Sequence, residues 1–153
     1  MSTKTCCVTG HREIPADKIE YVKIKLKEEL ERAIADGFTT FITGMAEGVD
    51  LLFAELVIEQ KDKHPALFLE AAIPYRNRLN ATGPFFRKCL EGCNGIKVQQ
   101  ESYNSDCFMN RNRYMVSLSS RVIAVYDGRE KGGTLFTMRY AHAMEREVRE
   151  IRI

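Results

Sequence analysis

Short runs of β-branched and aromatic residues alternate along the chain with longer amphipathic stretches, and Gly, Pro, Asn or Asp follows each short run. The short runs predict strands at residues 5–9, 39–43, 66–73, 95–100, 121–126 and 148–153. The longer stretches predict helices at residues 16–37, 49–60, 106–120 and 133–146. A broken or late-starting helix is expected within residues 78–93, because Gly83 and Pro84 fall there.

Strands that alternate with helices predict one parallel sheet with right-handed crossovers and helices on both faces. The continuous apolar run at 121–126 is typical of a strand in the middle of such a sheet. No repeat, low-complexity tract or interdomain linker interrupts the 153 residues. We therefore expect an α/β protein with a three-layer Rossmann-like fold, formed as a single domain over residues 1–153.

The first long helix is expected to end at Gly37 and to pack on the sheet through one apolar face, opposite a face of mostly Lys and Glu. The apolar positions are Ile19, Val22, Ile24, Leu26, Leu30 and Ile34. Gly37 and Gly92, in the loops ADGF and EGCNG that enter strands, are expected to be left-handed helix caps.

Small, polar and basic residues gather after the expected strands rather than before them. The segments are TGHRE (9–13), TGMAEGVD (43–50), PYRNR (74–78), ESYNSDC (101–107) and YDGREKGGT (126–134). In open parallel sheets, ligands bind beyond the carboxyl ends of the strands. The asymmetry therefore indicates one ligand-binding edge.

Two glycine-containing loops on this edge are candidate anion sites. Gly132, Gly133 and Thr134 begin the last expected helix, where free backbone N–H groups and the helix dipole favour a phosphate, and Thr137 follows one turn later. The alternative is a tight turn with Thr134 as the helix N-cap. In the second loop Gly44 and Gly48 frame another strand-to-helix turn, and Asp50 is either a first-turn charge or an acceptor for a ribose hydroxyl.

Basic and aromatic residues support the same edge. Arg12 follows Gly10 and His11, while Arg111 and Arg113 lie on one expected helix and diverge by roughly 200°, so at most one of these two should face the site. The other should pair with surface acids. His11 is a proton donor, a stacking partner or an ordinary hydrogen-bonding residue. Tyr75 and Tyr103 either stack on a base or are partly buried in the rim.

Composition limits the possible partners and locations. The chain has 23 Lys and Arg against 21 Asp and Glu, so its net charge is nearly neutral. This balance does not predict a protein that coats nucleic acid through overall positive charge. We see neither a signal peptide nor an apolar run of membrane-spanning length, and expect a cytoplasmic protein with no membrane partner. The five cysteines are expected to be reduced and mostly buried, with Cys6 and Cys7 on opposite faces of their strand. The pair Cys89 and Cys93 lacks a second ligand pair, so no metal site is predicted.

The segments CCVTGHRE, TGMAEGVDLLFAE, PYRNR, NRNRYMV and VIAVYDGREKGGTLFTMRYA, in this order, resemble the YpsA-like branch of the SMF/DprA-LOG (SLOG) superfamily. The likeness spans essentially the whole chain. It implies a Rossmann-like fold that binds nucleotides, nucleotide-derived ligands or single-stranded DNA. The LOG phosphoribohydrolases carry a Glu three residues after the threonine of a Gly-Gly-x-Gly-Thr signature, but here that position is Thr137. Glu47 or Asp50 would have to supply the missing carboxylate.

We expect a nucleotide-binding module that acts as a sensor or regulator, needs no further cofactor, and forms a homo-oligomer. The alternatives are a LOG-like N-glycoside hydrolase, a DprA-like single-stranded DNA-binding protein, and a protein-contact domain with a vestigial anion edge. Apolar residues that favour self-association are Phe85, Phe86, Met109, Met115 and Leu118. The predicted ligand-binding residues are Thr9, Gly10, His11, Arg12, Gly44, Met45, Ala46, Glu47, Gly48, Asp50, Tyr75, Arg111, Asn112, Arg113, Asp127, Gly128, Gly132, Gly133, Thr134 and Thr137.

Overall fold

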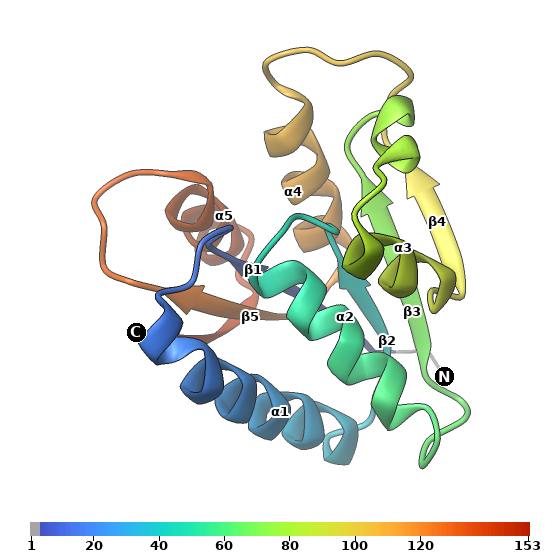
Figure 1. Ribbon diagram of the computed structural model, residues 1–153. Coiled ribbons are helices and arrows are strands. Elements are labelled where there is room, and N and C mark those ends of the chain that lie inside the picture. Colours follow the sequence, from blue (N-terminus) through green and yellow to red (C-terminus); the bar gives the residue numbers. More distant parts are fainter. Residues whose placement is uncertain (1–3) are drawn as a thin grey trace.

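A computed structural model describes residues 4–153 as a six-stranded sheet flanked by helices (Figure 1). The strands are β1 (Lys4–Gly10), β2 (Phe38–Thr43), β3 (Phe68–Ile73), β4 (Gly95–Val98), β5 (Arg121–Tyr126) and β6 (Glu147–Arg152). They lie in the order β4-β3-β2-β1-β5-β6, and every neighbouring pair is parallel. The parallel sheet predicted from the sequence is confirmed.

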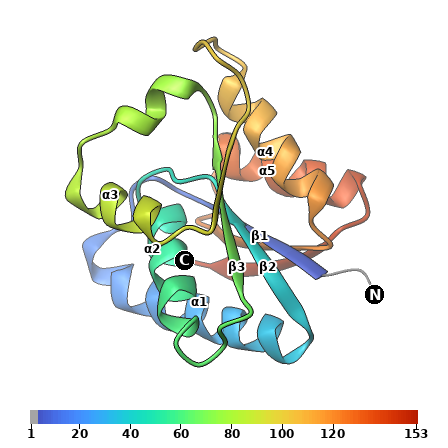
Figure 2. The ribbon, with the colours of Figure 1, turned by 90° about the vertical axis from the view of Figure 1, so that its right-hand side faces the viewer.

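Helices cover both faces of the sheet. They are α1 (Ile19–Ala35), α2 (Val49–Gln60), α3 (Pro84–Glu91), α4 (Cys107–Leu118) and α5 (Gly133–Ala143). Figure 2 shows α1, α2 and α3 on one side of the sheet and α4 and α5 on the other. Large buried side chains such as Phe41 and Phe53 fill the first layer, and a smaller cluster that includes Met115 fills the second. This is the expected three-layer Rossmann-like α/β fold.

The alternation of side chains along β1 sends neighbouring cysteines to different layers. Cys6 packs among the side chains beneath α1 and α2, while Cys7 packs beneath α4 and α5, as predicted. Burial raises the pKa of Cys7 to about 12, so its thiol stays protonated and unreactive. Cys93 donates a hydrogen bond from its thiol to the Cys89 carbonyl, and within residues 4–153 no group of His, Cys, Asp or Glu is arranged to hold a metal ion.

The first helix differs from its prediction at two points. A 3-10 turn, Ala16–Lys18, precedes α1, and Ile24 is 56% exposed instead of buried. Val22 and Leu26 are fully buried as expected. Because residues two positions apart diverge by roughly 200° on a helix, Ile24 cannot share their face.

Several element boundaries also shift. The late-starting helix is confirmed, because α3 begins with Pro84 after a 3-10 segment at Arg76–Asn80. Helix α5 ends three residues earlier than expected, where Glu145 adopts a left-handed φ of 59° and the Arg146 N–H donates to the Ala141 carbonyl at 2.9 Å. Gly37 is a left-handed cap with φ 95°, as predicted, whereas the same prediction for Gly92 is wrong, since its φ is −80°.

The apolar residues expected to favour self-association divide between core and surface. Phe86 and Met115 belong to the core, while Phe85 and Leu118 are 37% and 51% exposed. None of the helices within residues 4–153 has both the length and the apolar character needed to cross a membrane.

Candidate functional site

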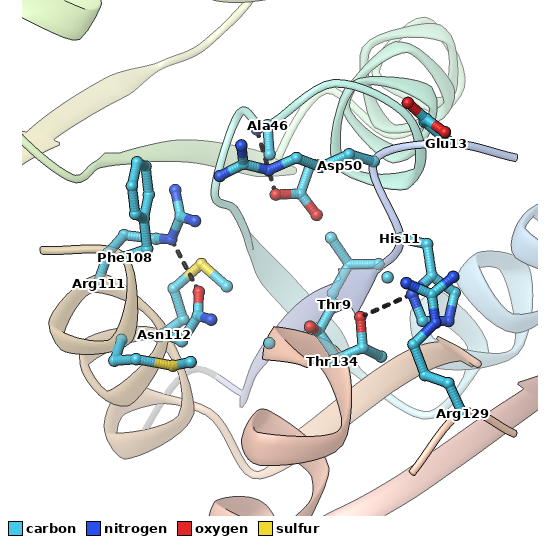
Figure 3. Close-up of a pocket in the computed structure, with 16 residues that line it drawn as sticks. Thr9, His11, Glu13, Ala46, Asp50, Phe108, Arg111, Asn112, Arg129 and Thr134 are labelled. Carbon is cyan, nitrogen blue, oxygen red and sulfur yellow. Dashed lines mark hydrogen bonds between the residues drawn. The ribbon is translucent and has the colours of Figure 1, made fainter. Parts of the chain in front are cut away.

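A cavity of about 460 Å³ lies beyond the carboxyl end of β1, beside the loop that follows β5 (Figure 3). We call it the main cavity. β1 connects through α1 to β2 on one side, whereas β5 lies on its other side, so the cavity is at the topological switch point of the sheet. Its lining residues are Val8, Thr9, Gly10, His11, Arg12, Glu13, Ala46, Asp50, Phe108, Met109, Arg111, Asn112, Met115, Arg129, Gly133 and Thr134.

Two glycines allow the loop after β1 to pack against the start of α2. A Cβ on Gly10 would lie 2.5 Å from the Cβ of Val49, so β1 and α2 approach more closely than a side chain permits. Gly48 has a φ of 82°, and a Cβ there would lie 2.5 Å from the carbonyl oxygens of His11 and Arg12. The Val49 N–H donates to the His11 carbonyl at 3.3 Å. Gly48 therefore shapes the site without lining it.

Asp50 places a buried carboxyl group in the main cavity from the first turn of α2. Its Oδ2 accepts the Ala46 N–H at 3.2 Å, and its carbonyl accepts the Thr43 hydroxyl at 2.9 Å. The side chain is only 6% exposed. Burial raises the pKa of Asp50 to about 6, although Arg111 and the Ala46 N–H act in the opposite direction. At pH 7 the group is an incompletely solvated carboxylate.

Arg111 is the arginine of α4 that faces the main cavity. Its Nη1 donates to the Gly44 carbonyl at 2.6 Å and its Nε donates to Asn112 Oδ1 at 2.8 Å. The residue is 5% exposed, and burial lowers its pKa. Arg113 points elsewhere: its guanidinium lies 5.1 Å from the Phe136 ring centroid and donates to Asn110. The expectation that it pairs with surface acids is wrong, because no acid among the described residues forms an ion pair with it.

His11 connects the loop after β5 to the start of α5. Its Nε2 accepts the Asp127 N–H at 3.1 Å, and its Nδ1 lies 3.5 Å from Thr134 Oγ1. Burial lowers the pKa of His11 more than the nearby Asp127 carboxylate raises it, so the ring is neutral at pH 7. Nε2 also lies 3.2 Å from Asp127 Oδ1, so the direction of the hydrogen bond between Nδ1 and the Thr134 hydroxyl depends on which ring nitrogen carries the proton.

The start of α5 contributes only part of the predicted glycine cradle. Gly133 and Thr134 line the main cavity, whereas Gly132 precedes the helix with a φ of 116° and lies outside it. Thr137 is fully buried and its hydroxyl donates to the Gly133 carbonyl at 2.8 Å, so this predicted ligand residue is not in the site. Gly128 is a left-handed turn residue close to Arg152 and also lies outside.

Asp127 does not line the main cavity, although its Oδ1 lies 3.2 Å from His11 Nε2. Its carboxylate forms two-pronged hydrogen bonds with the Arg129 guanidinium, which hold the pKa of Asp127 well below its ordinary value. Arg129 itself lines the cavity. Arg129 therefore brings a guanidinium to the cavity lining whose charge is largely balanced by Asp127.

A second cavity of about 320 Å³ adjoins the first and shares Arg12, Ala46, Phe108 and Arg111 with it. Its remaining lining residues are Glu47, Pro74, Tyr75 and Arg78. The ring centroids of Tyr75 and Phe108 are 6.4 Å apart, and Tyr103 completes an edge-to-face trio. The Arg12 guanidinium lies 4.9 Å from the Phe108 centroid. Predicted residues Glu47 and Tyr75 thus belong to this second cavity, and Met45 and Gly44 form the buried backbone behind both.

The sequence interpretation missed Phe108, Met115, Arg129 and Arg78. Phe108 and Met115 lie three residues before and four residues after Arg111 on α4, so they share its face. This spacing identifies them once the orientation of Arg111 is known. Arg129 lies in the loop YDGREKGGT, in which the sequence pattern predicts only Asp127, the three glycines and Thr134 as ligand residues.

Known proteins resemble this chain over most of its length. A UPF0398 protein from Enterococcus faecalis (strain ATCC 700802 / V583) is 27% identical over 164 residues, which cover 98% of this chain and 91% of that protein. The uncharacterized SPbeta prophage-derived protein YoqJ of Bacillus subtilis (strain 168) is 30% identical over 141 residues, covering 77% of this chain and 81% of that protein.

Solved structures share the fold at low identity. DNA processing protein A from Helicobacter pylori, whose structure is described for its single-stranded DNA binding mode, matches with a TM-score of 0.69 at 21% identity. The match covers 96% of this chain but only 64% of that one. TM1055, a structural genomics target, matches with a TM-score of 0.60 at 16% identity. Residues 6–153 also match the model of the YspA SLOG family, and the chain therefore belongs to that family.

Proposed function

We propose that the chain binds a nucleotide or a nucleotide-derived phosphate ligand in the main cavity and acts as a sensor or regulatory module. One observation carries the proposal: the main cavity joins the start of α5, at Gly133 and Thr134, to the cationic side chains of Arg12 and Arg111. This combination of backbone N–H groups, a hydroxyl and guanidinium groups is suited to a phosphate.

The phosphate position follows from the start of α5. Gly133 is exposed, and a Cβ built on it would meet no atom within 4 Å, so an anion can approach its backbone N–H. The hydroxyl of Thr134 adds a donor on the same side of the cavity. Arg12 is exposed and lines both cavities, so its guanidinium can reorient to pair with the phosphate of a ligand.

The base position follows from the second cavity. Tyr75 and Phe108 offer aromatic surfaces there, and base stacking on such side chains is largely independent of sequence. A nucleotide with its phosphate at Gly133 would place its sugar near Ala46 and Asp50 and direct its base toward Phe108. The two adjoining cavities therefore suit a ligand with an anionic end and an aromatic end.

A charge substitution at Gly133 tests the phosphate site. Gly133→Asp introduces a carboxylate without a clash in the protein, and repulsion should weaken nucleotide binding about tenfold or more, which corresponds to about 1.4 kcal/mol. The matched control is Gly133→Asn, which has the same shape and no charge. Titration calorimetry with nucleoside mono- and diphosphates measures the affinity of each of the two variants. Equal affinities for the two variants would place the phosphate elsewhere.

A hydrolase is the second candidate, and the observation that favours it is the buried carboxyl of Asp50 in the main cavity. LOG-like cleavage of an N-glycosidic bond proceeds through an oxocarbenium-like transition state that a carboxylate stabilises, and Thr137 cannot supply one. Chromatography for released base, after incubation with each nucleotide, separates the two functions. Released base that is lost in Asp50→Asn would establish hydrolysis, whereas binding without release supports the sensor.

Single-stranded DNA binding is the third candidate, favoured by the aromatic trio and by the structural likeness to DNA processing protein A. A short oligonucleotide in the same titrations distinguishes it. Binding of the oligonucleotide with no binding of free nucleotides would replace the sensor proposal.

A further inference from the structure

We propose that Asp50 reads a ribose hydroxyl of the ligand, so that the main cavity selects a ribonucleotide over its deoxy counterparts. The inference rests on the proposed function and adds to it the sugar class of the ligand. It begins with the state of the Asp50 carboxylate, which is more than nine-tenths buried yet only half satisfied.

One oxygen of Asp50 is fixed and the other is free. Oδ2 accepts the Ala46 N–H at 3.2 Å, whereas no side-chain hydrogen bond among residues 4–153 uses Oδ1. Figure 3 shows the Asp50 carboxylate among the side chains that line the cavity, with one of its oxygens joined to Ala46. Oδ1 does not belong to the fully buried side-chain atoms of residues 4–153 that lack a partner, so a ligand or solvent donor can reach it from the cavity.

Arg111 and Arg12 both favour the charged form of Asp50, but neither forms an ion pair with it among residues 4–153. Arg111 uses Nη1 on the Gly44 carbonyl and Nε on Asn112, and no ion pair joins it to Asp50 in the described part of the chain. Both groups lie over Gly44, where a Cβ would be 2.8 Å from Asp50 Oδ2 and 2.9 Å from Arg111 Cζ. Asp50 therefore keeps an acceptor for a group outside the protein.

The chemistry of that group follows from charge and geometry. A carboxylate repels phosphate, so the ligand's anionic end must lie elsewhere, at Gly133 and Arg12. Recognition of the guanine edge by a carboxylate uses both oxygens, and here only one is free. A single donor matches one free oxygen. The sugar hydroxyls are such donors in every ribonucleotide, whereas the exocyclic amines of adenine and cytosine are donors only in those bases, and comparison of all four nucleotides distinguishes the two.

The position of Asp50 agrees with this assignment. Ala46, to which Asp50 is bonded, lines both cavities, while Gly133 lines only the main cavity and Tyr75 only the second. Asp50 thus lies between the proposed phosphate and base positions. Phosphate, sugar and base follow one another in the same order along a nucleotide.

The experiment compares AMP, GMP, CMP and UMP with their 2′-deoxy and 3′-deoxy analogues by titration calorimetry on the full chain. The 2′-deoxy partner of UMP is dUMP. We expect at least one deoxy analogue to bind about tenfold more weakly than its ribonucleotide, since a site built to bond a hydroxyl rejects the compound that lacks it. The wild-type comparison alone decides this point and needs no variant.

Asp50→Asn then assigns the selectivity to its residue. The amide keeps an oxygen for the Ala46 N–H and replaces the charged acceptor by a neutral donor, so the charge-assisted hydrogen bond from the hydroxyl is lost and the ribonucleotide-to-deoxynucleotide affinity ratio should fall toward one. Glu59→Gln removes the same charge from an exposed position of α2 and should leave the ratio unchanged.

The other possible results contradict either the role of Asp50 or the proposed function itself. Equal affinity for ribo- and deoxynucleotides, or a ratio that survives Asp50→Asn, overturns the reading of Asp50 while nucleotide binding stands. A loss in Asp50→Asn that is confined to GMP and dGMP and equal for both assigns Asp50 to the base instead. Absence of binding by all the nucleotides overturns the proposed function, and the inference falls with it.

Discussion

Arg111 and Arg113, two positions apart on α4, show how one residue's surroundings decide its role. Arg111 is 5% exposed and bonds only to neutral oxygens, those of Gly44 and Asn112. Burying a cation without a bonded carboxylate is unfavourable, and burial accordingly lowers its pKa. An anionic ligand would supply the missing countercharge. Spacing alone predicts that only one of these arginines faces the site, but the rotation of α4, which packing on the sheet sets, decides which.

Arg12 offers a residue-level test because it lines both cavities while remaining exposed. Arg12→Ala should weaken nucleotide binding about tenfold, corresponding to about 1.4 kcal/mol, and the loss should be larger at low salt, where screening is weaker. Its fold should be nearly unaffected, since the side chain's protein contact is stacking on Phe108. Calorimetry at two ionic strengths measures the effect.

Arg113→Ala is the matched control for Arg12→Ala, because Arg113 is an equally exposed arginine that stacks on Phe136 outside the cavities. Its nucleotide affinity should equal that of the wild type. Equal weakening in both variants would mean that Arg12 acts through general charge and not through contact with the ligand.

At the scale of elements, the main cavity depends on the close packing of the loop after β1 against the start of α2. Gly48→Ala should destabilise the fold by roughly 1–3 kcal/mol, because its φ of 82° disfavours a side chain and the new Cβ would meet backbone oxygens. Thermal unfolding measures the loss. Gly133→Ala is the control, since its Cβ has open space and the variant should be no less stable than the wild type. A similar loss there would show that the contacts and φ of Gly48 are not the cause.

The elements themselves could largely be predicted from the sequence, since strands and helices here have distinct hydrophobic periods and glycine or proline boundaries. The ends that escaped prediction lack such signals. Glu145 adopts a left-handed conformation at the end of α5, where a glycine would have allowed this end to be predicted. Gly92 ends α3 but does not adopt a left-handed conformation. Thr137 was placed in the site because it is one turn after Thr134, but on α5 its hydroxyl turns back to the Gly133 carbonyl.

Across the whole molecule, the two ends of the sheet differ in whether their buried charged side chains form ion pairs. At the amino end of β5, Arg121 pairs with Asp36 at 2.8 Å and Glu147 at 2.7 Å, which joins α1 to β6. At the carboxyl end, Asp50 and Arg111 are both buried and form no ion pair with each other in the described chain. Unpaired charges of this kind lower stability, so their presence at one edge supports a ligand-binding role there. The near-neutral composition gave no sign of this local division.

The unpaired carboxyl also predicts how stability depends on pH. The pKa of Asp50 rises on folding from its ordinary 3.8 to about 6. A carboxyl with a raised pKa in the folded state contributes stability that is present below about pH 4 and lost as the pH rises through about 6. Asp50→Asn cannot ionise. The variant should therefore gain stability relative to the wild type between pH 4 and pH 7.5, by on the order of 1–3 kcal/mol.

Urea unfolding of both proteins across that pH range measures the difference, and the subtraction removes contributions common to both, such as that of His11, whose pKa is lowered by burial. The variant that is more stable without ligand should then be the one that has lost its preference for ribonucleotides. A constant difference across the range would mean that Asp50 titrates alike in the folded and unfolded chains, as it would if Arg111 fully compensated its burial. In that case the carboxylate would be a structural partner of Arg111, with no stability given up for a ligand.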